Sequence, residues 1–146
     1  MLPFQKQEFI NKDWKKHYEF IDNLINKYYY ADDEYGYLIK DSWKLILKIE
    51  NCLYTSANAS KDRDDLLRLL GAIEKQFEDY ITLVSPRHTK SFVKNMENLS
   101  KYNDGFIQDF SKDENLTYQY GQGWKYNNEK ISHHIRDAII IAHYEN

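Results

Sequence analysis

Apolar residues recur at steps of three and four along most of the chain, which is the spacing of an amphipathic helix. The first stretch covers residues 9–28 and stops at the acidic residues Asp32, Asp33 and Glu34. A second begins at Asp41 or Ser42 and reaches residue 53. These are its apolar positions: Trp43, Ile46, Ile49 and Leu53. The pattern predicts two helices in the first third of the chain.

Similar spacing continues toward the C-terminus. A third helix is predicted from Asp62 to Val84, because carboxylates suit its first turn and apolar residues follow at helical steps. Ser85 as N-cap and Pro86 at the first helical position predict the start of a fourth helix. A short fifth piece is expected over residues 106–110, and a last helix from Asn128 to the C-terminus. The segment TYQYGQGWKYNN before it, with two close glycines, is predicted to be an ordered loop.

The pattern contains no alternation strong enough to indicate a strand, and no internal repeat. We therefore expect an all-α fold, one single-domain bundle of five or six helices over residues 1–146. Long helices with apolar residues on more than one side also indicate a homodimer.

Composition and charge narrow the functional classes. The chain carries 20 Lys and Arg against 23 Asp and Glu, a net charge of −3, so tight non-specific DNA binding is not expected. Cys52 is the only cysteine, and no zinc-type spacing occurs, which predicts a reducing compartment and neither metal nor cofactor. No apolar run is long enough to cross a bilayer, so we expect a cytoplasmic protein without a membrane partner. The 13 tyrosines suit partly buried faces, interfaces or base stacking.

The last fourteen residues, HHIRDAIIIAHYEN, divide into two faces at about 100° per residue. One face is predicted to be the core face, and its members are Ile131, Ile135, Ala138, Ile139 and Ala142. The opposite face carries His133, Arg136, Ile140 and His143, with Asp137 beside it. The apolar Ile140 on this polar face indicates that something covers it, and a second subunit is the first expectation.

Arginine and histidine on one helix face suit phosphodiester chemistry. A guanidinium holds a phosphate through two hydrogen bonds, and an imidazole takes a proton from a ribose 2′-hydroxyl or returns one to the leaving oxygen. Candidate catalytic residues are therefore Arg136, His143, Asp137 and His133, in a reaction that requires no metal.

The pattern Arg136-Asp137, then AIIIA, then His143 resembles the R-x(4–6)-H motif of the HEPN superfamily, which comprises small all-α proteins that include ribonucleases and toxin components. The resemblance covers eight residues. It implies that Arg136 stabilises the scissile phosphate, that His143 transfers protons and that Asp137 orients one of them. In the commoner arrangement four residues separate Arg from His, and a tyrosine lies two positions after the histidine, whereas here Tyr144 follows directly.

Other residues offer weaker candidates. The aromatic loop could contact a substrate or partner, or close the bundle over its core, through Tyr120, Trp124, Lys125 and Tyr126. Arg87 and His88 lie in the first turn of a predicted helix, where phosphate binds well. Acidic groups that could bind Mg²⁺, but lack the paired-glutamate spacing of helical pyrophosphatases, are Asp32, Asp33, Glu34, Glu74 and Glu78.

Two functions are therefore expected. The first is a nucleic-acid-processing protein, a metal-independent HEPN-like ribonuclease that acts on RNA. The second is a non-enzymatic interaction protein, an immunity or antitoxin-type module whose acidic, tyrosine-rich surface binds a basic protein partner.

Overall fold

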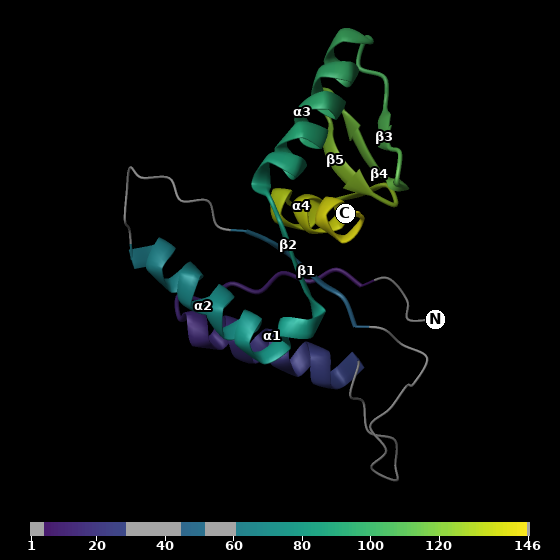
Figure 1. The fold of residues 1–146 in the computed structure, drawn as a ribbon. Helices are drawn as coiled ribbons and strands as arrows, with labels where there is room; N and C mark the ends of the chain where they lie inside the picture. The colour runs from purple at the N-terminus through teal and green to yellow at the C-terminus, as the bar shows by residue number, and fades with distance from the viewer. Residues whose placement is uncertain (1–4, 29–44, 52–60, 146) are drawn as a thin grey trace. The chain divides into compact units, whose positions relative to one another are not determined.

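The computed structural model describes residues 5–28, 45–51 and 61–145, and within them the chain has an α+β fold (Figure 1). The helices are α1 (Trp14–Tyr28), α2 (Lys61–Phe77), α3 (Pro86–Tyr102) and α4 (His133–Ala142), with a 3₁₀ turn at Glu78–Tyr80. The strands are β1 (Leu47–Glu50), β2 (Ile81–Val84), β3 (Gln108–Phe110), β4 (Asp113–Gln119), β5 (Gly123–Tyr126) and β6 (Glu129–Lys130). None of the helices in these residues is long and apolar enough to cross a membrane.

The expected all-α bundle is wrong, because three segments assigned to helices form strands. The second predicted helix contains β1, the end of the third is β2, and the fifth piece contains β3. These strands have three or four residues, and over so short a length the apolar spacing of a helix and of a strand cannot be told apart. The β-branched residues of ITLV in β2 favour extended backbone, and pairing with β1 satisfies its main-chain groups.

The chain divides into two compact units. Unit 1 comprises Met1–Glu8, Lys48–Asn51 and Leu83–Asn146, and unit 2 comprises Phe9–Leu47 and Cys52–Thr82. In unit 2, α1 packs against α2, and its buried apolar residues are Ile25, Leu70, Ile73 and Phe77. Before α1, the Phe9 ring stacks on Phe20 at a centroid distance of 4.6 Å. The predicted acidic cluster Asp32-Asp33-Glu34, Trp43 and Cys52 lie outside the described residues.

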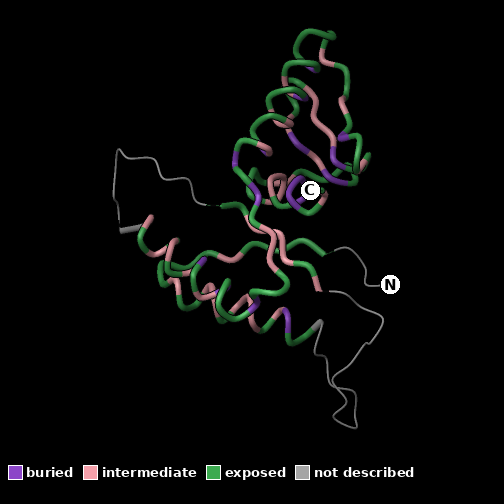
Figure 2. The backbone as a smooth tube through the Cα atoms, viewed as in Figure 1, coloured by how far each residue is buried: buried purple, intermediate pink, exposed green. Residues whose placement is uncertain are grey.

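Unit 1 is built on an antiparallel sheet in the order β3-β4-β5-β6. Leu116 pairs with Tyr126 and Tyr118 with Trp124, so these four side chains share one face of the sheet. Helices α3 and α4 cover that face, with Met96 from α3 and Ile139 and Ile140 from α4 in the same core cluster. Figure 2 shows this core as the buried parts of the strands and helices of unit 1.

Two tight turns make the sheet, and they explain why the aromatic segment is not a loop. Three residues join β4 to β5, with Gly121 at a φ of 83°, which favours glycine. Asn127 and Asn128 join β5 to β6, both with positive φ, as a two-residue hairpin turn of the I′ kind requires. The predicted helix start at Asn128 is therefore wrong, and α4 begins after Ser132, whose hydroxyl accepts a hydrogen bond from the Ile135 amide.

Local start signals succeed better for α3. The Ser85 hydroxyl accepts a hydrogen bond from the Arg87 amide, and Pro86 occupies the first helical position, as predicted. At the other end of α3 the fully buried Ser100 hydroxyl donates to the Phe106 carbonyl at 2.9 Å and accepts from the Tyr120 amide at 2.7 Å. One serine thus joins the end of α3 to the turn between β4 and β5.

The residues of α4 that pack on the sheet come from both predicted faces. Ile139, predicted to face the core, is buried in the core cluster, and so is Ile140, predicted to lie on the polar face, while Ala138 and Ala142 are exposed. The sheet was not expected, so nothing in the helical pattern indicated what would cover Ile140. Its cover is the sheet of the same chain, and the inferred homodimer stays a prediction.

Candidate active site

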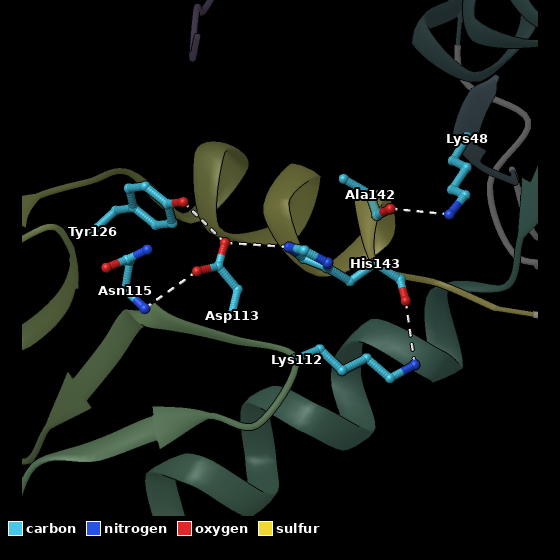
Figure 3. Close-up of polar contacts among 7 residues, drawn as sticks. All are labelled: Lys48, Lys112, Asp113, Asn115, Tyr126, Ala142 and His143. Atoms are coloured by element: carbon cyan, nitrogen blue, oxygen red, sulfur yellow. Dashed lines mark hydrogen bonds and ion pairs between the residues drawn. The ribbon is translucent and has the colours of Figure 1, made fainter. Parts of the chain in front are cut away.

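Three side chains from different elements form a hydrogen-bonded series in unit 1 (Figure 3). The Tyr126 hydroxyl donates to Asp113 Oδ2 at 2.9 Å, and His143 Nε2 lies 3.2 Å from the same oxygen. The Asp113 side chain is 11% exposed and that of His143 is 36% exposed. A largely buried carboxylate therefore holds the Nε2 side of an imidazole that solvent reaches, and leaves Nδ1 of that ring for another partner.

The sheet places Asp113 at this point through an irregularity. Gln108 and Asp109 pair regularly with β4, but the register then shifts so that Phe110 faces Asp113 across the turn Ser111-Lys112. The Asn115 amide donates to Asp113 Oδ1, which fixes the carboxylate in the turn. Such irregularities re-aim side chains, and here Asp113 points to the end of α4.

The C-terminal end of α4 is held by two lysines. Lys48 Nζ donates to the carbonyl oxygen of Ala142 at 3.0 Å, and Lys112 Nζ donates to that of His143 at 3.2 Å (Figure 3). Lys48 Nζ also donates to the carbonyl oxygen of Tyr144 at 2.6 Å. Cations are favourable there because the last carbonyls of a helix lack main-chain partners. His143 is therefore fixed through both its backbone and its ring, although it lies three residues from the end of the sequence.

The environment shifts the pKa values of this series. Burial by itself raises the pKa of Asp113, but the hydrogen bonds from Tyr126, His143 and the Asn115 amide outweigh it and lower the pKa below 3.8. Burial and the adjacent Asp113 raise the pKa of the Tyr126 phenol above 10.0. Asp113 is thus a stable anion and Tyr126 a stable donor at neutral pH.

A second imidazole lies in the same neighbourhood. The His88 ring, from the first turn of α3, contacts Tyr144 edge-on at a centroid distance of 4.8 Å and Phe92 at 4.9 Å. Phe92 contacts Phe110, which in turn contacts the His143 ring at 5.9 Å. Burial, together with the charge of Lys112, lowers the pKa of His88 below 6.5, so its neutral form is favoured.

The structure engages Arg136 and Asp137 elsewhere. Arg136 Nε donates to Asp137 Oδ1 at 2.8 Å, and the guanidinium lies 5.2 Å from the centre of the Trp124 ring. The Arg136 side chain is only 11% exposed. Trp124 Nε1 donates to Glu97 Oε1 at 3.2 Å, which ties β5 to α3. Arg136 and His143 therefore contact different carboxylates, and helical rise separates them by about 10 Å.

The other predicted site residues are dispersed. His133 is exposed at the start of α4, about 15 Å along the helix from His143. Trp124 and Tyr126 are buried in the core as residues of β5, whereas the alternative interpretation expected them in a loop that closes a helical bundle. Lys125 lies on the opposite face of the sheet, and Tyr120, in the turn, is 56% exposed. Tyr120 is therefore the exposed aromatic side chain among the four predicted contact residues.

Unit 2 contains a surface groove. An open groove of about 680 Å³ is lined by Asn11, Lys12, Trp14, His17, Asp65, Leu66 and Leu69. His17 Nε2 already contacts the Asn11 carbonyl oxygen at 2.8 Å, and Asp65 is paired with Arg68 at 3.0 Å. The predicted metal-binding residues Glu74 and Glu78 are exposed. No group of three side chains that could hold a metal ion occurs in the described part of the chain. The site around His143 is the stronger candidate active site, because hydrogen bonds orient its side chains toward one another.

The sequence pattern named His143 as a candidate, but it did not indicate the residues that contact it. Asp113 precedes His143 by 30 residues and Lys48 precedes Tyr144 by 96, and nothing in a helical pattern relates such positions. Comparison with models of known protein families, with curated proteins and with solved structures finds no match to this chain.

Proposed function

We propose that this chain processes nucleic acid, and that it cleaves RNA by acid–base catalysis with His143 and His88. The observation that carries the proposal is the contact of the solvent-accessible His143 ring with Asp113. A carboxylate that fixes the orientation of an imidazole and stabilises its protonated form is the usual support of a catalytic histidine.

The two histidines suit opposite roles. His88, whose neutral form is favoured, takes the proton of a ribose 2′-hydroxyl, and the 2′-oxygen forms a bond to phosphorus. The bond from phosphorus to the 5′-oxygen breaks, and His143, whose ring contacts Asp113, gives a proton to that oxygen. The products are a 2′,3′-cyclic phosphate and a 5′-hydroxyl. Both proton transfers are supplied by the chain, so the reaction needs no metal.

Lys112 is the cation suited to the developing charge on the phosphate. Its side chain is exposed, its Nζ lies 3.2 Å from the His143 carbonyl oxygen, and its charge reaches His88. Arg136, to which the HEPN resemblance assigns this role, would first have to leave Asp137 and Trp124. That resemblance stays a prediction, but the all-α fold it implied is wrong, and the proposal does not depend on it.

The test is cleavage of RNA by the full chain in EDTA, with His143→Gln and Asp113→Asn compared with wild type. The matched control is His134→Gln, which changes an exposed histidine of the same helix. We expect wild type and the control to produce a 2′,3′-cyclic phosphate end, and the two site variants to lose at least a hundredfold in rate. DNA of the same sequence should stay intact because it lacks the 2′-hydroxyl. Intact RNA with wild-type protein would refute the proposal and favour the alternative, an interaction protein that binds a basic partner.

A further inference from the structure

We propose that the exposed face of α3, together with the aromatic residues at its C-terminal end, binds single-stranded RNA. The inference rests on the proposed function in one respect, the choice of RNA as the ligand. Its test measures binding alone, so it can succeed or fail independently of cleavage.

The exposed face of α3 carries a row of positively charged side chains. Arg87, Lys90, Lys94 and Lys101 are all exposed, and at about 100° per residue they lie within a sector of about 60°. None of them forms a salt bridge with a described residue. Burial and Asp137 raise the pKa of Glu50, and the nearby charge of Lys90 offsets this rise in part. The helix rise of 1.5 Å per residue spreads this row over about 21 Å.

The one acidic residue of α3, Glu97, borders this row, three residues after Lys94 and four before Lys101. Its carboxylate accepts a hydrogen bond from the indole of Trp124. Unit 1 as a whole carries ten Lys and Arg against ten Asp and Glu, whereas unit 2 carries ten against thirteen. The net charge of −3, which argued against nucleic acid, therefore falls on unit 2, and the exposed face of α3 presents four cations beside the single carboxylate of Glu97.

Exposed aromatic side chains gather where the row ends. Tyr102 is 76% exposed, Phe106 68% and Tyr120 56%. The buried Ser100 binds the main chain of Phe106 and of Tyr120, so these residues are held beside the last turn of α3. Lys101 Nζ lies 5.7 Å from the centre of the Tyr102 ring, which brings a cation and a stacking surface together.

Cations in a row next to exposed rings are the features with which proteins bind single strands, since phosphates follow the charges and unpaired bases stack on the rings. The other end of the row reaches the candidate active site, because Arg87 adjoins His88, whose ring contacts Tyr144. A strand that follows α3 would therefore have its backbone at the two histidines and its bases on the rings about 20 Å away. A duplex keeps its bases stacked internally and would gain from the charges only.

The test uses the full chain with His143→Gln, which prevents cleavage, and a fluorescent 12-nucleotide single-stranded RNA in an anisotropy titration. One variant adds Arg87→Gln, Lys94→Gln and Lys101→Gln. Its control removes the same charge from unit 2 by Lys12→Gln, Lys15→Gln and Lys75→Gln, all exposed. We expect the α3 variant to bind at least tenfold more weakly and its slope of log K against log salt to fall by about two. The control should bind within twofold of the parent.

The stacking part is tested by Tyr102→Ala with Tyr120→Ala, against Ile10→Ala, which removes another highly exposed apolar side chain. We expect a loss of about tenfold or more that salt does not change, and a preference for the single strand over a duplex of the same sequence. Equal losses in the α3 variant and its charge control, or tighter binding of the duplex without an effect of the tyrosines, would overturn the inference. Absence of RNA binding by the parent would overturn it as well.

Discussion

Lys48 Nζ donates a hydrogen bond of 2.6 Å to the main-chain oxygen of Tyr144, so a residue of β1 holds the end of α4. The same ammonium group also reaches the Ala142 carbonyl. Because His143 lies between these two residues, the position of its ring depends on a residue 96 positions from Tyr144 in the sequence. The site is thus assembled by long-range contacts rather than by the helix alone.

Replacement of that lysine should loosen the end of α4. We expect Lys48→Met to lower the free energy of unfolding by about 1.5–3 kcal/mol, since hydrogen bonds to charged groups contribute about this much. Hydrogen exchange of the amides of residues 141–145 should become faster. The rate of RNA cleavage should fall, although the variant retains His143. Lys125→Met, on the outer face of the sheet, is the control. Equal exchange in both variants would contradict the anchoring role.

The carboxylate of Asp113 should matter for both rate and stability. Asp113→Asn keeps the size of the side chain but removes the charge that supports His143, so kcat should fall by at least a hundredfold with little change in KM. We expect the variant to unfold about 2 kcal/mol more easily at pH 7.

The difference in free energy of unfolding between wild type and Asp113→Asn should become smaller as the pH falls. The pKa of Asp113 is lowered in the folded chain, so its stabilisation is present above the unfolded value near 3.8 and is lost as the pH falls through the folded value. Denaturant titrations of wild type and Asp113→Asn at pH 7 and pH 3 check this. A gap that stays constant or widens at pH 3 would speak against the hydrogen-bonded anion.

His88 should set the acid limb of the pH–rate profile. As the base it must be neutral, and its lowered pKa places the limb below pH 6.5. Removal of the nearby charge by Lys112→Gln should move the limb upward toward pH 6.5, whereas Lys125→Gln should leave it in place. Folding responds as well, because the unfolded chain protonates this residue more readily, so stability falls as the pH drops through about 6.5. A profile without an acid limb would argue against this base.

The buried face of α4 can be tested without any assumption about function. Ile140→Ala should destabilise unit 1 by about 3 kcal/mol, because this side chain is fully buried against the sheet and its removal leaves a cavity. Ala138→Ser, at an exposed position, should change the stability by less than about 0.5 kcal/mol. If a second subunit rather than the sheet covers Ile140, the loss should instead depend on protein concentration.

Ser100 offers a polar counterpart. Ser100→Ala removes a buried hydroxyl that serves the Phe106 carbonyl and the Tyr120 amide, and should lower the free energy of unfolding by about 1–3 kcal/mol. Ser91→Ala changes an exposed serine of the same helix and serves as its control. Thermal unfolding of both variants measures the difference, and equal stabilities would show that the hydroxyl does not join the two segments.

Some parts of the fold could be predicted from the sequence and others could not. Ser85 and Pro86 act on their own helix, so the start of α3 was predictable from local chemistry. The pair Asn127-Asn128 also carried a local signal, that of a two-residue hairpin turn, which the interpretation as a helix start missed. The strand β1 carried none, because four residues acquire their conformation from a partner strand distant in the sequence.

The candidate site also contains residues that the sequence could indicate and residues that it could not. His143 could be named as a candidate from the sequence because its residue type and its place on the last helix are local features. Asp113 could not, since its position depends on a register shift between β3 and β4 that only the folded sheet defines. Ile140 was assigned to the polar face for a related reason, because the sheet that covers it was not expected, whereas Ile139, assigned to the core face, is buried in the same cluster.

The sheet of unit 1 ends on two very short strands, β3 with three residues and β6 with two. Such brief edges expose few free main-chain donors and acceptors, and Asp109 on one edge and Lys130 on the other add charge where a foreign strand would have to approach. Both edges are therefore poor templates for a strand from another molecule. Short, charged edges of this kind work against edge-to-edge association of sheets.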